Sequence, residues 1–331
     1  MNADNPFALL GLAPELLNAV ADLGYTTPTA VQLQAIPLAL HDPEAQSQND
    51  LMVSSQTGSG KTAAFLLPVL HTLLSQQQAK LAEEQRRWAE QVAAAEAAGE
   101  PLPKRARRKD PTNPRNFKPA VPGALVLCPT RELAQQVARD AIDLVKHCKG
   151  LRIACVVGGL PYAVQIARLQ NADLVVATPG RLLDLQRSNH LNLDQVQFLV
   201  VDEADRMLDL GFADELQRVL ALLPTQRQTL LFSATYGPEV QTLAHSLLRE
   251  PVRVTYTDGF DGLPVFSPDG KKLCWTANRT ADQKSQLFLA DWNHDAALAS
   301  LAKAPERSNA AAASPVQTPK PDEPKKTSTA Q

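Results

Sequence analysis

Two closely spaced glycines precede a lysine and a threonine in this chain. The glycines allow consecutive backbone N–H groups to turn toward one point and form a nest for an anion. The lysine would supply a charge for a terminal phosphate, and the threonine hydroxyl is a ligand for Mg²⁺. The general pattern begins with glycine, whereas this loop begins with serine. A flexible turn is the alternative to the predicted phosphate loop, Ser55-Gln56-Thr57-Gly58-Ser59-Gly60-Lys61-Thr62.

An acidic pair could complete this chemistry. Asp202 and Glu203 directly follow the apolar run 198–201. Asp202 can hold Mg²⁺ through water, and Glu203 can orient and deprotonate an attacking water. Acidic residues are also favoured at a helix N-terminus, which is the alternative for the pair taken alone. Together with Lys61 and Thr62, the pair predicts a triphosphate site in which Lys61, Asp202 and Glu203 are catalytic and Thr62 and Asp202 hold the metal.

Six short apolar runs are expected to position these residues. Their hydrophobicity is continuous rather than alternating, which is typical of strands covered on both faces and therefore of a parallel sheet. The predicted fold class is α/β, a doubly wound sheet with helices on both faces. Ligands bind beyond the carboxyl ends of such strands, and each suggestive motif starts there. The predicted strands are Leu51–Ser54, Ala124–Cys128, Arg152–Val157, Leu174–Ala177, Phe198–Val201 and Thr229–Phe232.

Composition places the chain among globular proteins. Its 331 residues are 44% apolar, and a net charge of −2 excludes a bulk attraction to nucleic acid, so any polyanion site must be local. Neither a leader nor a bilayer-spanning run is evident, and we expect a cytoplasmic protein without membrane contact. The cysteines lack metal or redox spacing and are predicted to be reduced and buried: Cys128, Cys148, Cys155 and Cys274.

Residues 75–123 interrupt the strand pattern and are predicted to be an insertion. An Ala/Glu/Gln/Arg-rich helical stretch ends near Gly99 and precedes the basic run Lys104–Lys109. A solvated helix and loop that leave the core alone is the plainer interpretation. The alternative is that Lys104, Arg105, Arg107, Arg108 and Lys109 hold RNA phosphates through counterion release.

With these motifs, the first 256 residues resemble the DEAD-box ATP-dependent RNA helicases, specifically the bacterial type that unwinds short duplexes. The acidic segment reads Asp202-Glu203-Ala204-Asp205, and the segment 24–32 is similar to the family's adenine reader. Ala30 and Val31 replace its usual Pro and Ile. A primary amide such as that of Gln32 matches the donor and acceptor on the edge of adenine. The resemblance implies a RecA-like domain that binds ATP and Mg²⁺ and contacts the base through Phe7, Tyr25 and Gln32.

Three further motifs resemble the family's contacts to the RNA backbone. Each follows a predicted strand, and the two that contain proline and threonine, 129–134 and 178–181, are also plausible helix starts with threonine as the cap. Hydroxyl, amide and guanidinium groups there would bind phosphate and sugar of single-stranded or short duplex RNA without reading its sequence. The implied RNA-binding residues are Thr130, Arg131, Gly159, Thr178, Gly180 and Arg181. The segment 233–235 resembles the motif that couples hydrolysis to strand separation, implying coupling by Asp205, Ser233 and Thr235.

Beyond Tyr256 the resemblance ends. The family needs a second α/β domain with arginines for the γ-phosphate, but no His-Arg-x-x-Arg segment follows, and Arg279 and Arg307 lie in other contexts. Residues 257–301 are predicted to be a separate β fragment. Within it, residues 259–301 are similar to one TolB-like or WD40-like β-propeller repeat, with Ser267-Pro268-Asp269-Gly270 as a hairpin turn. The tail 302–331 is predicted to be disordered. A junction near Thr257 is typical of a fused, truncated or mis-joined reading frame, and the sequence leaves these three open.

Three functional hypotheses follow. The first is an ATP-dependent RNA helicase by descent, represented by residues 1–256, that binds ATP and RNA weakly and does not unwind duplexes alone. The alternative is a non-enzymatic RNA- or partner-binding module from a truncated or fused helicase gene, in which binding survives Lys61→Ala and Glu203→Gln. The third treats the propeller-like segment as the functional portion.

Overall fold

The computed structural model describes the chain in two compact units, residues 1–260 and 261–331. Residues described in full are 6–40, 49–54, 58–98, 103–104, 118–249, 251–252 and 254, together with the backbone of Arg253 and of strands 265–266, 272–277 and 286–291. Several predictions fall outside this set. They concern Ser55-Gln56-Thr57, the basic run beyond Lys104, the turn at 267–270 and the tail 302–331.

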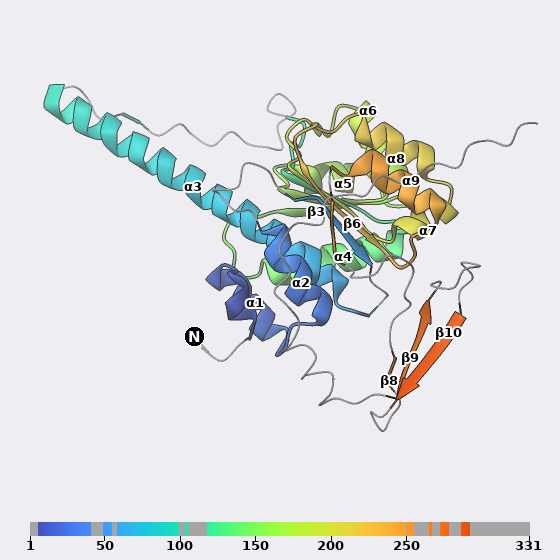
Figure 1. Cartoon of the computed structure of the whole chain (residues 1–331). Coiled ribbons are helices and arrows are strands. Elements are labelled where there is room, and N and C mark those ends of the chain that lie inside the picture. Colours follow the sequence, from blue (N-terminus) through green and yellow to red (C-terminus); the bar gives the residue numbers. More distant parts are fainter. Residues whose placement is uncertain are drawn as a thin grey trace, which may run out of the picture. The chain divides into compact units, whose positions relative to one another are not determined.

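A parallel sheet forms the centre of the first unit (Figure 1). Its strand order is β3-β4-β2-β5-β6-β1-β7, and each strand pair in it is parallel. The six predicted strands are confirmed within one residue at each end. The sequence did not predict β7, which is only two residues long and pairs with β1. The strands are β1 Leu51–Ser54, β2 Ala124–Leu127, β3 Ile153–Val156, β4 Leu174–Ala177, β5 Phe198–Val201, β6 Gln228–Ser233 and β7 Val252–Arg253.

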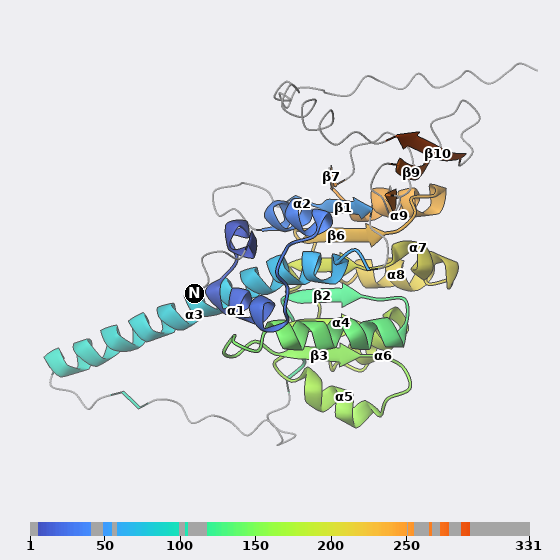
Figure 2. The same cartoon turned by 90° about the horizontal axis from the view of Figure 1, so that it is seen from below.

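Helices cover both faces of this sheet, as predicted (Figures 1 and 2). Successive strand residues point to opposite faces, so Leu51 and Val53 pack in one core with α1 to α4, and Met52 packs in the other with α6 to α9. The helical elements are the 3₁₀ turn η1 Pro6–Leu10, α1 Pro14–Asp22, α2 Ala30–Ala39, α3 Lys61–Ala98, α4 Arg131–Leu144, α5 Tyr162–Leu169, α6 Pro179–Arg187, α7 Ala204–Asp209, α8 Ala213–Leu220 and α9 Pro238–Leu247.

Helix α3 joins the phosphate loop to the predicted insertion without a break. It runs for 38 residues, and the part up to Leu74 is buried in the core through residues such as Phe65 and Leu70. From Ser75 onward the helix is mostly exposed and extends away from the sheet (Figure 1). Glu83 forms ion pairs with Arg86 and Arg87 on this exposed part. The helical part of the insertion is therefore solvated, as predicted.

Asp50 fixes the strand that leads into the phosphate loop. Its carboxylate is buried, and Oδ1 accepts a 2.7 Å hydrogen bond from the backbone N–H of Thr229. Oδ2 accepts a second, also 2.7 Å, from the backbone N–H of Arg249. One side chain thereby joins the start of β1 to the start of β6 and to the segment after α9. These bonds help to fix the position of β1 in the sheet.

The cysteines are free thiols in the described part of the chain. Burial raises the pKa of Cys128 well above its usual value and raises the pKa of Cys148 to about 11. Cys155 is half-buried rather than buried, which corrects the prediction for that residue. These thiols are protonated at neutral pH and are therefore poor nucleophiles.

The second unit contains a three-stranded antiparallel sheet in the order β10-β9-β8. Its strands are β8 Val265–Phe266, β9 Lys272–Ala277 and β10 Gln286–Asp291. β8 pairs antiparallel with β9, with Val265 opposite Cys274 and Phe266 opposite Leu273. None of the helices in the described part of the chain is both long and apolar enough to cross a lipid bilayer.

Candidate active site

The carboxyl ends of β1, β5 and β6 carry the predicted chemistry. Because β1 and β5 both flank β6, the segments that follow these three strands meet at one edge of the sheet. Lys61 follows β1 at the first position of α3, Asp202 and Glu203 follow β5, and Thr235 follows β6. The fold therefore brings the phosphate loop and the acidic pair together.

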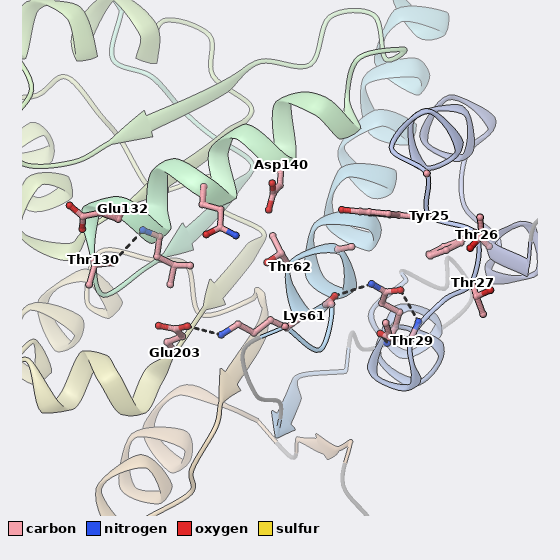
Figure 3. Close-up of a pocket in the computed structure, with 18 of the residues that line it drawn as sticks. Tyr25, Thr26, Thr27, Thr29, Lys61, Thr62, Thr130, Glu132, Asp140 and Glu203 are labelled. Atoms are coloured by element: carbon pink, nitrogen blue, oxygen red, sulfur yellow. Dashed lines mark hydrogen bonds and ion pairs between the residues drawn. The ribbon is translucent and has the colours of Figure 1, made fainter. Parts of the chain in front are cut away.

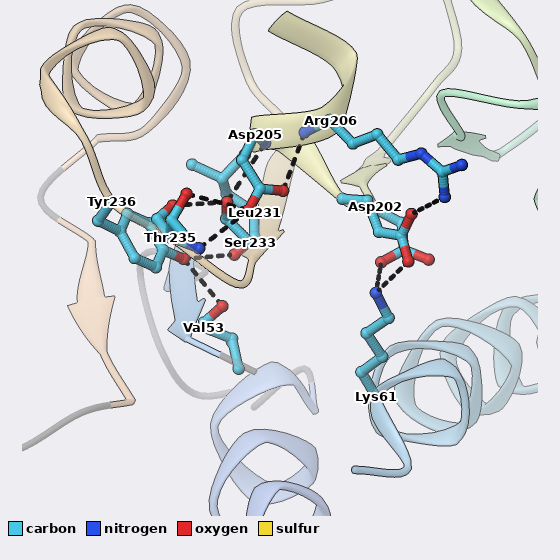
Figure 4. Close-up of polar contacts among 10 residues, drawn as sticks. Val53, Lys61, Asp202, Asp205, Arg206, Leu231, Ser233, Thr235 and Tyr236 are labelled. Atoms are coloured by element: carbon cyan, nitrogen blue, oxygen red, sulfur yellow. Dashed lines mark hydrogen bonds and ion pairs between the residues drawn. The ribbon is translucent and has the colours of Figure 1, made fainter. Parts of the chain in front are cut away.

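Lys61 forms ion pairs with both acidic residues. Its Nζ lies 3.1 Å from Asp202 Oδ1 and 3.0 Å from Glu203 Oε1 (Figure 4). Lys61 is only 7% exposed and Asp202 is fully buried, so the contacts are shielded from water. Arg206, which is exposed, adds a 3.3 Å contact to the other oxygen of Glu203.

Glu203 has an unusual backbone conformation. Its φ of 51° and ψ of 55° lie in the left-handed region, which residues other than glycine adopt at a cost. Glu203 is also the residue immediately before α7, where its side chain makes no capping bond. Its carboxylate instead points toward Lys61. Strained backbone of this kind concentrates at functional sites, and here it accompanies the residue proposed as the base.

Burial and charge act in opposite directions on the ionisable groups here. Burial raises the pKa of Asp202 to about 6, although the neighbouring Lys61 acts against this. Burial by itself lowers the pKa of Lys61, but the Asp202 and Glu203 carboxylates outweigh it and raise that pKa above its usual value. Lys61 is therefore charged at neutral pH, while Asp202 gains a proton under mildly acidic conditions.

Stability should depend on pH through Asp202. A carboxyl whose pKa is higher in the folded state contributes stability below about pH 3.8, and this contribution is lost as the pH rises through about 6. Asp202→Asn has no such titration. The free energy of unfolding of the variant minus that of the wild type should therefore increase from pH 4 to pH 7, on the order of 2 kcal/mol. Urea unfolding of both proteins across this range measures it, and a difference that does not change with pH contradicts the assignment.

The Asp202 carboxylate is suited to a hydrated cation. Both of its oxygens are buried and accept no hydrogen bond that meets normal geometry, so lone pairs remain beside the Lys61 ion pair. Among the described residues, no group of three or more His, Cys, Asp or Glu side chains could enclose a metal. A carboxylate with phosphates and waters is how Mg²⁺ is usually held, and this donor set fits it better than a metal bound by protein alone.

Gln32 connects the loop glycines to helix α2. Its Oε1 accepts a 3.0 Å hydrogen bond from the Thr29 N–H in a capping box, and its Nε2 donates a 3.0 Å bond to the Gly60 carbonyl. Each group keeps a further hydrogen or lone pair, which is what an adenine edge would use. The side chain is thus already oriented by α2 and the phosphate loop.

Replacing Gly60 by alanine should cost more stability than replacing Gly58. Both glycines have φ near +80°, so an added Cβ strains either position by about 1 kcal/mol. A Cβ on Gly60 would also lie 2.6 Å from Gln32 Nε2, whereas one on Gly58 meets nothing within 4 Å. In urea unfolding without nucleotide, Gly60→Ala should therefore have a lower free energy of unfolding than Gly58→Ala. Equal losses would mean that the Gln32 contact is unimportant.

A cavity of about 840 Å³ joins these parts (Figure 3). Phe7 and Tyr25 stack at a centroid distance of 6.5 Å at one end, and both line the cavity. Lys61 points from the start of α3 toward Glu203 at the other end. Of the predicted nucleotide contacts in the described residues, those lining the cavity are Phe7, Tyr25, Gln32, Gly58, Gly60, Lys61 and Thr62, together with Glu203.

One wall of this cavity was not predicted from the sequence. It is formed by Glu132, Gln136 and Asp140 of α4, which recur every four residues on one face of the helix. Burial, with a smaller effect from Asp143, raises the pKa of Asp140. The four-residue spacing was the available signal, but polar residues at that spacing usually indicate only a solvated face.

The predicted coupling residues form a hydrogen-bonded cluster next to the acidic pair (Figure 4). Asp205 Oδ2 accepts bonds from the Thr235 N–H at 2.9 Å and from the Thr235 hydroxyl at 3.1 Å. Ser233 Oγ accepts a 3.3 Å bond from the Asp205 N–H. Tyr236 then donates a 2.8 Å bond to the Val53 carbonyl on β1. This network links the ends of β5, β6 and β1.

A second groove has a volume of about 420 Å³. It gathers five of the six predicted backbone contacts, while Gly159 lies against Arg131 and its neighbour Gly158 lines the groove instead. The groove residues are Pro129, Thr130, Arg131, Glu132, Gly158, Thr178, Gly180, Arg181, Asp184 and Phe212. Asp184 and Phe212 were not predicted to lie at this groove, because no sequence motif marks them.

The two threonines in this groove differ in their capping bonds. Thr130 caps α4 as predicted, because its Oγ1 accepts a 3.3 Å bond from the Leu133 N–H. Thr178 occupies the position before α6, but its side chain makes no capping bond, so the predicted cap is wrong there. The Thr178 side chain is buried against the groove instead.

The parallel sheet, the glycine loop and the acidic pair define a RecA-like nucleotide-binding domain. The DEAD/DEAH box helicase family matches residues 29–243, and the chain belongs to the DEAD-box RNA helicases. It is 36% identical over 292 residues to the ATP-dependent RNA helicase DeaD of Haemophilus influenzae, covering 87% of this chain and 39% of that protein. It is 39% identical over 250 residues to the ATP-dependent RNA helicase SrmB of the same organism, covering 75% of this chain and 47% of SrmB.

Solved structures agree with the family assignment. A DEAD box protein from Methanococcus jannaschii matches with a TM-score of 0.56 and 32% identity, covering 75% of this chain and 55% of that one. Dbp5 of S. cerevisiae, in a structure bound to Gle1 and IP6, matches with a TM-score of 0.56 and 31% identity. The match covers 76% of this chain and 52% of the Dbp5 chain. The chain spans less than half of DeaD and of SrmB.

Proposed function

We propose that this chain is the ATP-binding half of an RNA-dependent ATPase of the helicase type. The observation that supports this best is that Lys61 and Glu203 line the same cavity as Gln32 and Phe7, while the buried Asp202 lies 3.1 Å from Lys61 Nζ. Family membership implies ATP binding and RNA binding in general terms. The assignment of individual residues, of Mg²⁺ and of catalytic activity to this chain is our proposal, with the cytoplasm as the proposed location.

Lys61 has to change partners when ATP binds. Without nucleotide its charge is neutralised by Asp202 and Glu203, and we propose that it turns to the β- and γ-phosphates above the loop glycines. Asp202 would then hold Mg²⁺ through water, and the metal would neutralise charge on the phosphates. Glu203, released from Lys61, would orient the attacking water and accept its proton.

The second groove, which we propose as the RNA groove, is suited to phosphate and sugar. Its hydroxyl, amide and guanidinium groups come from the starts of α4 and α6 and from the turn after β3. Helix N-termini with neighbouring arginines favour a polyanion, and none of these groups would read base edges. We therefore propose binding of single-stranded or short duplex RNA, independent of its sequence, through Thr130, Arg131, Gly159, Thr178, Gly180 and Arg181.

We further propose that residues 1–256 form the ATP-binding domain and that residues 257–301 are separate from it. Unwinding would need a second RecA-like domain that supplies arginine to the γ-phosphate. In related phosphoryl-transfer enzymes, such an arginine increases kcat by roughly 10³- to 10⁵-fold. The 331-residue polypeptide, studied on its own, is thus expected to bind both ligands weakly and to turn over slowly.

The test uses this polypeptide in three assays. Fluorescence anisotropy should detect binding of a labelled ATP analogue and of a labelled oligouridine, and strand displacement of a short RNA duplex should stay at background. Efficient unwinding by this polypeptide contradicts the need for a second domain. RNA binding without any nucleotide binding contradicts the ATPase proposal and favours the binding-module alternative.

A further inference from the structure

A turn after β3 holds one of the two groove arginines in place. Arg181 projects from the first turn of α6, and its guanidinium carbon lies 4.3 Å from the centre of the Tyr162 ring at the start of α5. Arg181 Nη1 also donates a 3.1 Å hydrogen bond to the Leu160 carbonyl. The Arg181 side chain is only 13% exposed, which is low for an arginine that faces a groove.

The turn itself is braced by a buried glutamine. Gln165 is 1% exposed, and its Oε1 accepts a 3.1 Å bond from the Val157 N–H. Its Nε2 donates a 3.0 Å bond to the Leu160 carbonyl, the same oxygen that Arg181 contacts. The buried Gln165 therefore fixes the position of the Leu160 carbonyl. This carbonyl in turn is a fixed hydrogen-bond acceptor for Arg181.

Tyr162 contacts Arg181 without facing the groove. Arg181 lines the groove, whereas Tyr162 is not among the described residues that line it. The ring face attracts the guanidinium, and this contact limits the rotation of a long side chain. An arginine that is already ordered loses less conformational freedom when it binds a phosphate, so its contact to the ligand is stronger.

We propose that Tyr162 is a positioning residue for RNA binding, which acts by holding the Arg181 guanidinium toward the groove. The proposal depends on the function proposed above, in which Arg181 contacts an RNA phosphate. It identifies a determinant of RNA affinity that carries no charge and does not line the groove. Val164, exposed on the same helix, offers a matched control.

The test is a double-mutant cycle with a labelled oligouridine, measured by anisotropy across salt concentrations. Tyr162→Leu keeps apolar bulk and removes the aromatic face, and it should weaken binding about 3- to 10-fold. Tyr162→Phe keeps the face and should stay within 2-fold of wild type, as should Val164→Ala. In an Arg181→Ala background, Tyr162→Leu should add less than a 2-fold loss, because its partner is gone.

The salt dependence gives a second readout. Arg181→Ala should reduce the slope of log K against log salt by about 0.7, as expected for one phosphate contact on a single strand. Tyr162→Leu should also reduce this slope, although it removes no charge, because Arg181 is then held less firmly at the phosphate. An unchanged slope, or equal losses in both Arg181 backgrounds, overturns the positioning role while leaving the groove intact. If Arg181→Ala binds like wild type, the RNA groove and the positioning role both fail.

Discussion

Replacing Lys61 by alanine is expected to remove measurable ATP binding and to lower single-turnover ATP hydrolysis at least 100-fold. Lys61 is the cation that we propose for the β- and γ-phosphates, and loss of one such preorganised donor typically costs 10²–10³ in rate. The same change leaves Asp202 and Glu203 close together without their shared partner. We therefore also expect a lower free energy of unfolding, by up to ~3 kcal/mol.

The control for this prediction is Lys80→Ala, because Lys80 is exposed on the outer part of the same helix. ATP binding is measured by anisotropy with a fluorescent analogue, and stability by urea unfolding. Lys80→Ala should match wild type in both. If Lys61→Ala stays folded and binds ATP as wild type does, the phosphate loop is not the nucleotide site.

Glu203→Gln should separate nucleotide binding from chemistry. The amide is nearly the same size as the carboxylate and can still contact Lys61, but it cannot accept a proton from water. ATP affinity should stay within a few-fold of wild type, while single-turnover hydrolysis falls about 10²–10⁴-fold. Quenched-flow or slow manual mixing with excess enzyme measures this step without any need for product release.

Asp214→Asn provides the matched change for Glu203→Gln, since Asp214 is an exposed acidic residue at the start of α8. It should leave both affinity and hydrolysis unaffected. Equal hydrolysis by Glu203→Gln and wild type would assign the base to another residue. Glu132 of the α4 wall would then be the next candidate, because it lines the same cavity.

The sequence predicted the sheet well because its strands are continuous apolar runs between helices. β5, Phe198–Val201, has four apolar residues that are all buried, and it was found with both bounds correct. β7 was missed because two residues, Val252 and Arg253, are too few to form a pattern. The phosphate loop and acidic pair were found because their residue types are rare in combination and each follows a strand.

Contacts between distant segments could not be predicted in the same way. The bond from Gln32 to the Gly60 carbonyl joins residues 28 positions apart, and the contact between Tyr162 and Arg181 depends on how α5 and α6 begin. Nothing in the local sequence indicates that Thr178 leaves its helix uncapped, while Thr130 caps its own. Tertiary packing decides such details, and local propensity does not contain them.

The most direct test of the account is a crystal structure of this chain with a non-hydrolysable ATP analogue and Mg²⁺. The account predicts phosphates above Gly58 to Thr62, adenine between Phe7 and Gln32, and Lys61 Nζ moved from the acidic pair to the phosphates. Asp202 should face the metal through water. Nucleotide bound elsewhere, or bound in this cavity while Lys61 keeps both of its ion pairs, would contradict it.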